Sequence, residues 1–258
     1  DEPTVSMFFH VNNSPFAGKE GKFLTSRNIS ERLFRETLSN VSLKVNKTSE
    51  TDVFEVCGRG ELQMAILIET MRREGYEFMA SKPRVITKEE NGVILEPVES
   101  VFLDLEEEHV GIITEKLSAR KGRMINLYNN GFGRTTLEFK VPSRGMIGFR
   151  NQFLTNTKGS GILNTLFDSY APWFGNIPQR NSGVIVADRP GKVTPYASLA
   201  MVDRGELFVD IGVEVYKGMV VGERNKPGDL DVNIVREKKL TNMRSSSKDN
   251  TVVLRPPQ

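Results

Sequence analysis

The first third of the chain alternates between two hydrophobic periods. Apolar residues at every second position indicate strands, and apolar residues at every third or fourth position indicate helices. The order is strand, helix, strand, strand, helix, strand, with strands over residues 5–10, 43–45, 53–57 and 76–80 and helices over residues 28–41 and 61–74. The first helix begins near Asn28, where an Asn with a Glu three positions later resembles a capping box, and its predicted apolar face extends to Leu38 and Val41. Gly75 is placed to end the second helix.

The middle third repeats this order. The predicted strands cover residues 98–105, 124–128, 135–141 and 162–169, and the predicted helices start at residue 106 and cover residues 145–156. Similar sequences precede the second predicted helix in both thirds, and their Arg-Gly pairs, Arg59-Gly60 and Arg144-Gly145, are 85 residues apart. The sequence therefore predicts two tandem ferredoxin-like βαββαβ domains, residues 1–88 and 89–175, with these Arg-Gly pairs at equivalent positions and the polar stretch 88–92 as a boundary.

The last third has a different pattern of hydrophobic residues and turn signals. Short β-branched runs recur between turn signals such as Lys217-Gly218 and Pro227-Gly228. The runs predicted as strands are residues 184–187, 199–202, 207–209, 213–216, 219–221, 232–235 and 252–254. We therefore expect an all-β C-terminal domain, residues 176–258, and an α+β fold class for the whole chain.

Composition narrows the class of protein. The chain has 258 residues, of which 38% are hydrophobic and 26% charged, as in a folded globular protein. No apolar run reaches the ~18 residues that a membrane span needs. The single cysteine, Cys57, argues against a disulfide framework, and we expect it to be a small core residue. With two histidines, His10 and His109, both expected at the surface or at strand ends, we expect no zinc site.

Catalytic motifs are missing from the sequence. It contains neither a Gly-x-x-x-x-Gly-Lys-[Ser/Thr] phosphate loop nor a nucleophile–base pair, so we expect no catalytic, cofactor-binding or metal-binding residues. The glutamates at residues 106–108 could hold a cation, but carboxylates at a helix start also complement the helix dipole, and that interpretation is favoured. Gly131-Phe132-Gly133 resembles part of an RNA-recognition motif but lacks its later aromatic residues, which favours a glycine-rich turn instead.

The strongest binding signal is a basic segment late in the chain. The whole chain has a net charge of +2, whereas residues 236–248 carry five basic side chains and one acidic one, which gives +4. Lysine and arginine beside hydroxyl and amide groups suit phosphate and ribose contacts, and the alternative is a solvated loop. The predicted RNA-binding residues are Lys238, Lys239, Leu240, Thr241, Asn242, Met243, Arg244, Ser245, Ser246 and Lys248.

Several stretches resemble the BipA (TypA) family of translational GTPases, which is related to elongation factor G. The resemblance covers essentially the whole chain, and Lys238-Lys239-Leu240-Thr241-Asn242-Met243-Arg244 is a particularly strong marker. Further matching stretches include Ser14-Pro15-Phe16-Ala17-Gly18-Lys19-Glu20-Gly21-Lys22 and Pro142-Ser143-Arg144-Gly145-Met146-Ile147-Gly148-Phe149-Arg150.

The resemblance carries implications for domains, partners and cofactors. Residues 1–88 and 89–175 would correspond to the third and fifth domains of the elongation factor G plan, and residues 176–258 to the family's own C-terminal domain, whose last segment we expect beyond residue 258. The family docks at the factor site of the ribosome, which implies rRNA, ribosomal proteins and A-site tRNA as partners, a bacterial cytoplasmic location, and roles in stress adaptation and ribosome assembly. GTP and Mg belong to the family's GTPase domain, which has no counterpart in this sequence, so we expect no cofactor and no enzymatic activity here. We also expect a monomer and no membrane partner.

An interpretation of a different class stays open. Paired ferredoxin-like domains often hold a small effector at their interface, so the chain could be a regulatory ligand-binding protein. A small-molecule pocket between the two domains would favour that interpretation, and co-sedimentation with ribosomes would favour docking.

Overall fold

The chain divides into two compact units. The computed structural model describes residues 3–177 and 182–238, and the units are Asp1–Pro178 and Gln179–Gln258. The first unit contains two sheets, each with its own buried hydrophobic cluster, and we call these parts the first lobe (residues 3–85) and the second lobe (residues 88–177). The whole is a mixed α+β structure with several antiparallel sheets.

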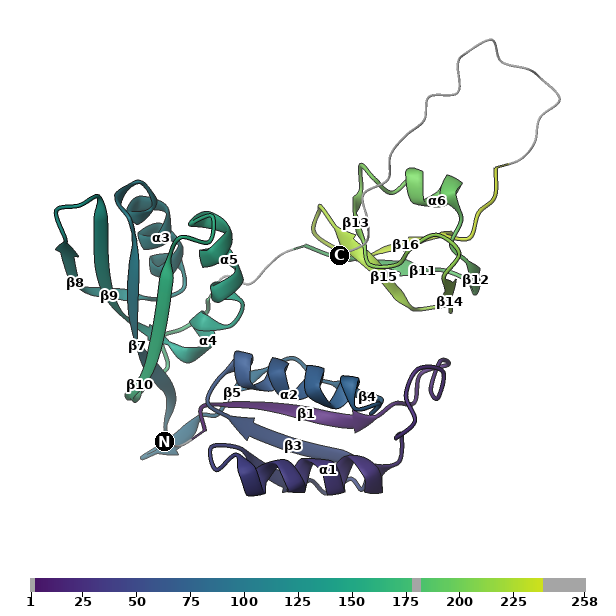
Figure 1. Ribbon diagram of the computed structural model, residues 1–258, viewed down its shortest axis with the longest axis horizontal. Helices are drawn as coiled ribbons and strands as arrows, with labels where there is room; N and C mark the ends of the chain where they lie inside the picture. The colour runs from purple at the N-terminus through teal and green to yellow at the C-terminus, as the bar shows by residue number, and fades with distance from the viewer. Residues whose placement is uncertain (1–2, 178–181, 239–258) are drawn as a thin grey trace, which may run out of the picture. The chain divides into compact units, whose positions relative to one another are not determined.

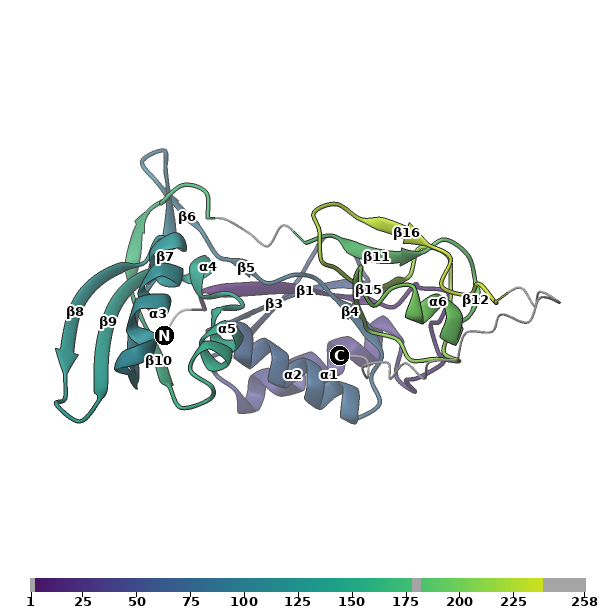
Figure 2. The ribbon, with the colours of Figure 1, turned by 90° about the horizontal axis from the view of Figure 1, so that it is seen from above.

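The first lobe is an antiparallel sheet with two helices on one face (Figures 1 and 2). The sheet order is β2-β3-β1-β4, and β5 pairs with the start of β1. Phe9 lies opposite Phe54 in the β1–β3 register, and both belong to one core cluster with Leu33 and Met64 from the two helices. The elements are β1 (Val5–Val11), α1 (Ser26–Ser39), β2 (Lys44–Lys47), β3 (Val53–Gly58), α2 (Glu61–Arg73), β4 (Phe78–Ala80) and β5 (Arg84–Val85).

The start of α1 differs from the prediction. Thr25, and not Asn28, is the N-cap, and its hydroxyl accepts the Asn28 N–H at 3.2 Å. The predicted apolar face is wrong at its far end, because Leu38 is 85% exposed and Val41 is 92% exposed. The end of α2 agrees with the prediction, since Gly75 follows it with a positive φ of 91°.

A charged residue occupies an inner position of α1. The Arg32 side chain is 8% exposed, and its guanidinium donates to Glu36 at 2.8 Å and to Glu74 at 2.9 Å. These bonds satisfy the guanidinium where water has little access, as a buried charge requires. The helix periodicity did not indicate this position, because Glu74 is far away in the sequence.

The second lobe is also an antiparallel sheet backed by helices, with the order β10-β7-β9-β8 and with β6 pairing with the start of β7. Leu103 lies opposite Leu137 in the β7–β9 register, in a core cluster with Ile113 and Phe153 from the helices. The elements are β6 (Lys88–Glu90), β7 (Val93–Glu106), α3 (Glu107–Ala119), β8 (Arg123–Asn129), β9 (Arg134–Pro142), α4 (Ser143–Met146), α5 (Phe149–Asn156) and β10 (Ile162–Pro172).

One feature of the second lobe departs from the prediction, and another was not predicted. The single helix expected over residues 145–156 is two helices, α4 and α5, because Gly148 takes a left-handed φ of 71° between them. The polar stretch 88–92, which was expected as a boundary, forms a hairpin at the start of the second lobe, in which Lys88–Glu90 pairs with the first residues of β7. Asn91 and Gly92 form its turn, both with positive φ.

The second unit contains a four-stranded sheet of order β13-β15-β11-β16 and a small sheet of β12 and β14. The β11–β16 pair is parallel, and Ile185 and Val221 are fully buried in its core. The elements are β11 (Val184–Ala187), β12 (Gly191–Lys192), α6 (Pro195–Leu199), β13 (Gly205–Leu207), β14 (Glu214–Val215), β15 (Val220–Arg224) and β16 (Leu230–Val232).

The all-β expectation for this unit is wrong at one element. The strand expected over residues 199–202 is replaced by the end of α6 and a turn. Thr194 caps the helix by accepting the Ala197 N–H at 3.2 Å, and Pro195 occupies its first turn, where a missing N–H has no cost. The strand expected over residues 252–254 lies outside the described residues. Among the described residues, no helix combines the length and apolar character that crossing a membrane requires.

Candidate nucleic-acid interface

The predicted RNA-binding segment is described only at its start. Lys238 is exposed and follows the exposed Arg236 and Glu237. The remaining predicted residues lie outside the described part of the chain, and they are Lys239, Leu240, Thr241, Asn242, Met243, Arg244, Ser245, Ser246 and Lys248.

The root of this basic segment is fixed to α6. Ile234 is 1% exposed, and its carbonyl accepts the Thr194 N–H at 3.2 Å. The Thr194 hydroxyl donates to the Arg236 carbonyl at 2.5 Å. A single threonine thus caps α6 and holds the backbone at Ile234 and at Arg236, where the basic segment begins. The basic segment therefore leaves the folded unit from a defined position.

An aromatic ring accompanies the cation at this root. The Arg236 guanidinium lies over the Tyr196 ring, 5.6 Å from its centroid, and the ring remains partly exposed. Guanidinium planes and tyrosine rings are the groups on which proteins stack nucleic-acid bases, and arginine also binds phosphate. Sequence reasoning missed Tyr196, because its partner lies 40 positions further along the chain and no local pattern links the two.

The second Arg-Gly pair anchors the end of the first unit. The Arg144 guanidinium donates to the Glu96 carboxylate at 2.5 and 3.0 Å, donates to the Gly175 carbonyl, and lies 3.8 Å from the Trp173 ring centroid. Glu96 is fully buried and also accepts the Phe174 N–H at 2.7 Å. This cluster fixes the backbone just before the chain passes to the second unit.

The two Arg-Gly pairs occupy different positions in their elements. Arg59-Gly60 lies between β3 and α2, whereas Arg144-Gly145 lies within the short helix α4, directly after β9. Their surroundings differ. A Cβ on Gly145 would come within 2.7 Å of the Arg120 carbonyl oxygen, whereas a Cβ on Gly60 would meet nothing within 4 Å. Gly60 is also extended, with φ 178°. Close backbone approach therefore requires glycine at residue 145 and not at residue 60.

A hydrogen bond links the start of α2 in the first lobe to the turn between α4 and α5 in the second lobe. The Gly148 N–H donates to the Glu61 carboxylate of α2 at 2.7 Å. On the other side of Gly148, the Arg120 guanidinium donates to the Gly145 and Ile147 carbonyls at 2.6 and 3.0 Å, and burial lowers the pKa of Arg120. The α4–α5 turn is thus held from both lobes.

The long connection between β1 and α1 is held by one carboxylate. Glu77 accepts the N–H groups of Gly18, Glu20 and Gly21 at 2.8, 3.2 and 2.8 Å, and the Asn12 side-chain amide at 2.6 Å. Burial acts to raise the pKa of Glu77, but these donors outweigh it and hold that pKa below its ordinary value. Glu77 therefore orders the stretch that matches the family around Ser14.

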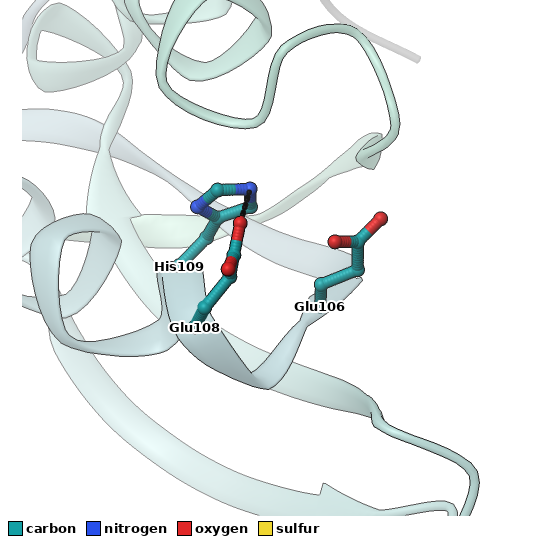
Figure 3. Close-up of side chains that lie close together, drawn as sticks. All are labelled: Glu106, Glu108 and His109. Carbon is teal, nitrogen blue, oxygen red and sulfur yellow. Dashed lines mark ion pairs between the residues drawn. The ribbon is translucent and has the colours of Figure 1, made fainter.

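The glutamates at the start of α3 form an acidic cluster with a histidine. Figure 3 shows the Glu108 carboxylate against the His109 ring, 3.2 Å from Nε2, with Glu106 beside them. The Lys158 ammonium also lies 3.5 Å from Glu108. His109 is buried on α3, so the expectation of a surface or strand-end residue is wrong. The pairing of Glu108 with Lys158 and the position at a helix start favour a dipole-complementing role for these carboxylates.

Cys57 agrees with its predicted role. It is 5% exposed on β3, and burial, assisted by the nearby Glu55 carboxylate, raises the pKa of its thiol to about 11. A thiol with so high a pKa is almost wholly protonated at neutral pH, so it is a poor nucleophile.

Comparison with known proteins places the whole chain in one family. Two family models match, TypA/BipA C-terminal domain over residues 182–258 and Elongation factor G C-terminus over residues 93–181. Proteins named large ribosomal subunit assembly factor BipA are 52% identical over 99% of this chain in Bacillus subtilis (strain 168), and 49% and 48% identical over 100% of it in Escherichia coli (strain K12) and Haemophilus influenzae. The chain spans 42% of the length of each of these relatives.

The comparison with solved structures is weaker. A crystal structure from Thermus thermophilus aligns with 67% of this chain and 41% of its own length, at 16% identity and a TM-score of 0.45, which is too low to establish a shared fold. The sequence relatives and both family models agree with each other, and on that basis the chain belongs to the BipA/TypA family and corresponds to the C-terminal part of its members.

Proposed function

We propose that this chain is the ribosome-docking part of a BipA-like translational GTPase and that its basic segment contacts RNA, including A-site tRNA. The observation that carries the proposal is the charge of residues 236–248, +4 against +2 for the whole chain, on a root fixed by Thr194. The relatives are named large ribosomal subunit assembly factors, which supports the ribosome as partner. Roles in stress adaptation and in ribosome assembly, in the bacterial cytoplasm, belong to the same proposal.

The proposed domain plan follows elongation factor G. We infer that residues 1–88 and 89–175 are ferredoxin-like domains equivalent to its third and fifth domains, followed by a β-rich family-specific domain over residues 176–258. The order of elements in each lobe and the sheet orders β2-β3-β1-β4 and β10-β7-β9-β8 support this plan. In this plan the protein is a monomer, since the ribosome itself is the partner.

Nucleotide chemistry is assigned to another part of the relatives. We infer that GTP and Mg bind in a GTPase domain outside this chain. The residues of this chain would then act without a cofactor and without a catalytic residue of their own. A labelled guanine nucleotide is expected to show no micromolar binding to the pure chain. Binding at that level would contradict this assignment, because phosphate loops supply such affinity through backbone amides and a lysine.

The rival function, effector binding between two paired domains, gains no support from the described hollows. One hollow is lined by residues of the first lobe between Ser26 and Phe54, and another by residues of the second lobe between Glu106 and Arg134. Each of these hollows lies within a single lobe. Effector binding at a site between domains would require a cleft lined from both sides.

Ribosome pelleting tests the proposal. In the full-length protein, Lys238, Lys239 and Arg244 are replaced together by alanine, and the matched control replaces Lys217, Lys226 and Arg204, which are exposed in the same unit, so that the same charge is removed. The first variant should pellet less and the control should pellet as wild type. Equal pelleting of both variants would show that the segment is a solvated connector.

A further inference from the structure

An aromatic side chain at the tip of the β8–β9 hairpin is almost wholly exposed. Phe132 is 94% exposed, more than any other large apolar residue in the described part of the chain. An exposed phenylalanine keeps a large apolar surface in water, and residues of this kind act as anchors when they enter a pocket on a partner. Phe132 is therefore available to act as such an anchor.

The hairpin tip is held by several hydrogen bonds. Asn129 accepts the Gly131 N–H through its side chain at 2.8 Å, and the Asn130 N–H donates to the Arg134 carbonyl at 3.0 Å. The Gly133 carbonyl accepts the Glu107 N–H at 3.1 Å, which ties the tip to the start of α3. A tip held in this way presents its side chain without a large ordering cost on binding.

The surroundings of Phe132 are acidic. It lines one hollow with Glu106, Glu107, Glu108, Gly133 and Arg134. The Arg134 guanidinium is already paired with Asp104, and Lys158 lies 3.5 Å from Glu108. The lining of the hollow carries three carboxylates and one cation, which gives it a net charge of −2 beside the aromatic ring.

This charge selects the class of partner. A phosphate backbone would be repelled by the carboxylates, whereas lysine or arginine on a protein surface would be attracted to them. Proteins that live among nucleic acids carry such basic surfaces. We propose that the Phe132 tip docks on a basic ribosomal protein, with the ring in an apolar pocket and the glutamates facing lysine or arginine. The inference rests on the proposed ribosome docking and names a protein, and not rRNA, as the partner at this surface.

Photo-crosslinking identifies the partner class. A p-benzoylphenylalanine at position 132 of the full-length protein is irradiated with purified ribosomes, and the crosslinked species is treated with nuclease or protease. The matched control places the same group at Leu166, 65% exposed on β10 at the other edge of the sheet. We expect a nuclease-resistant, protease-sensitive product from position 132 and none from position 166. An RNA product, or no product from a ribosome-bound protein, overturns the inference.

The affinity of Phe132 variants for the ribosome tests the same proposal quantitatively. Phe132→Ala should weaken ribosome binding about tenfold or more, as for an anchor residue, while Phe132→Trp keeps most of the affinity and Leu166→Ala changes nothing. Because Phe132 is exposed, these variants should keep the wild-type circular dichroism spectrum. Unchanged affinity of Phe132→Ala, with binding still reduced in the Lys238, Lys239 and Arg244 variant, overturns the inference and leaves the proposed function standing. Failure of the wild-type protein to bind ribosomes overturns both.

Discussion

Replacing Glu96 by alanine removes the carboxylate that holds Arg144 at the end of the first unit. Glu96 is fully buried and the Arg144 side chain is 14% exposed, so water cannot readily replace the missing carboxylate. Breaking a buried pair by deleting one member costs about 3–5 kcal/mol, because an uncompensated charge remains. The Phe174 N–H loses its acceptor as well. Against a typical total of about 5–15 kcal/mol, such a loss would be severe.

The chain provides its own probe for this experiment. Trp173 is the single tryptophan, and its ring lies 3.8 Å from the Arg144 guanidinium. Urea unfolding followed by tryptophan fluorescence therefore reports on this junction. We expect Glu96→Ala to shift the fluorescence midpoint to lower urea by the equivalent of about 3–5 kcal/mol.

Two further variants serve as comparisons for Glu96→Ala. Glu69→Ala breaks ion pairs with Arg72 and Arg73 that are exposed to solvent, so the urea midpoint should stay close to that of the wild type. Glu96→Leu combined with Arg144→Met removes both buried charges and should recover much of the loss. A Glu96→Ala midpoint within about 1 kcal/mol of wild type would refute the role assigned to this pair.

Three further predictions concern single side chains. Gly145→Ala should lower the thermal midpoint by the equivalent of about 1–3 kcal/mol, because its Cβ would come within 2.7 Å of the Arg120 carbonyl, whereas Gly60→Ala should be nearly neutral; equal effects in calorimetry would contradict this. Alkylation of Cys57 by iodoacetamide at pH 8 should be slow in the native chain and fast in urea, because burial raises the pKa of the Cys57 thiol to about 11 in the fold. Fast labelling of the native chain would contradict the buried, protonated thiol. Because the fold lowers the pKa of Glu77, the ionised carboxylate should stabilise the protein above its unfolded-state pKa, and this stabilisation should be lost as the pH falls through its folded-state pKa. Glu77→Gln should therefore make the free energy of unfolding depend less on pH in the acidic range. An unchanged pH dependence in this variant would contradict the role of Glu77.

Sequence patterns predicted the helices and strands that depend on residues close together in the sequence. The α2 helix was predicted from residue 61 to its glycine stop, because apolar spacing and Gly75 act within a few residues of each other. The element order of both lobes could be predicted for the same reason. A strand was predicted over residues 199–202, but α6 ends at Leu199 and a turn follows, because the apolar run around Leu199 is compatible with either structure and the Thr194 cap places a helix before it.

The candidate site depended on contacts between distant residues, and sequence reasoning could not supply them. The basic charge of residues 236–248 was visible in the sequence, but the Tyr196 ring beneath Arg236 was not. The buried glutamate beneath Arg144 was missed for the same reason, since 48 positions separate the two residues. A charged residue in a polar stretch looks solvated until its partner is known.

The salt dependence of ribosome binding tests the central claim most directly. Removing one phosphate contact should reduce the slope of log affinity against log salt by about 0.7–0.9, so replacing Lys238, Lys239 and Arg244 with alanine should lower it by up to about 2–3. The charge-matched variant of Lys217, Lys226 and Arg204 should keep the wild-type slope. Contact between the basic segment and RNA predicts both of these results. Identical slopes for wild type and both variants, with unchanged circular dichroism, would contradict that contact.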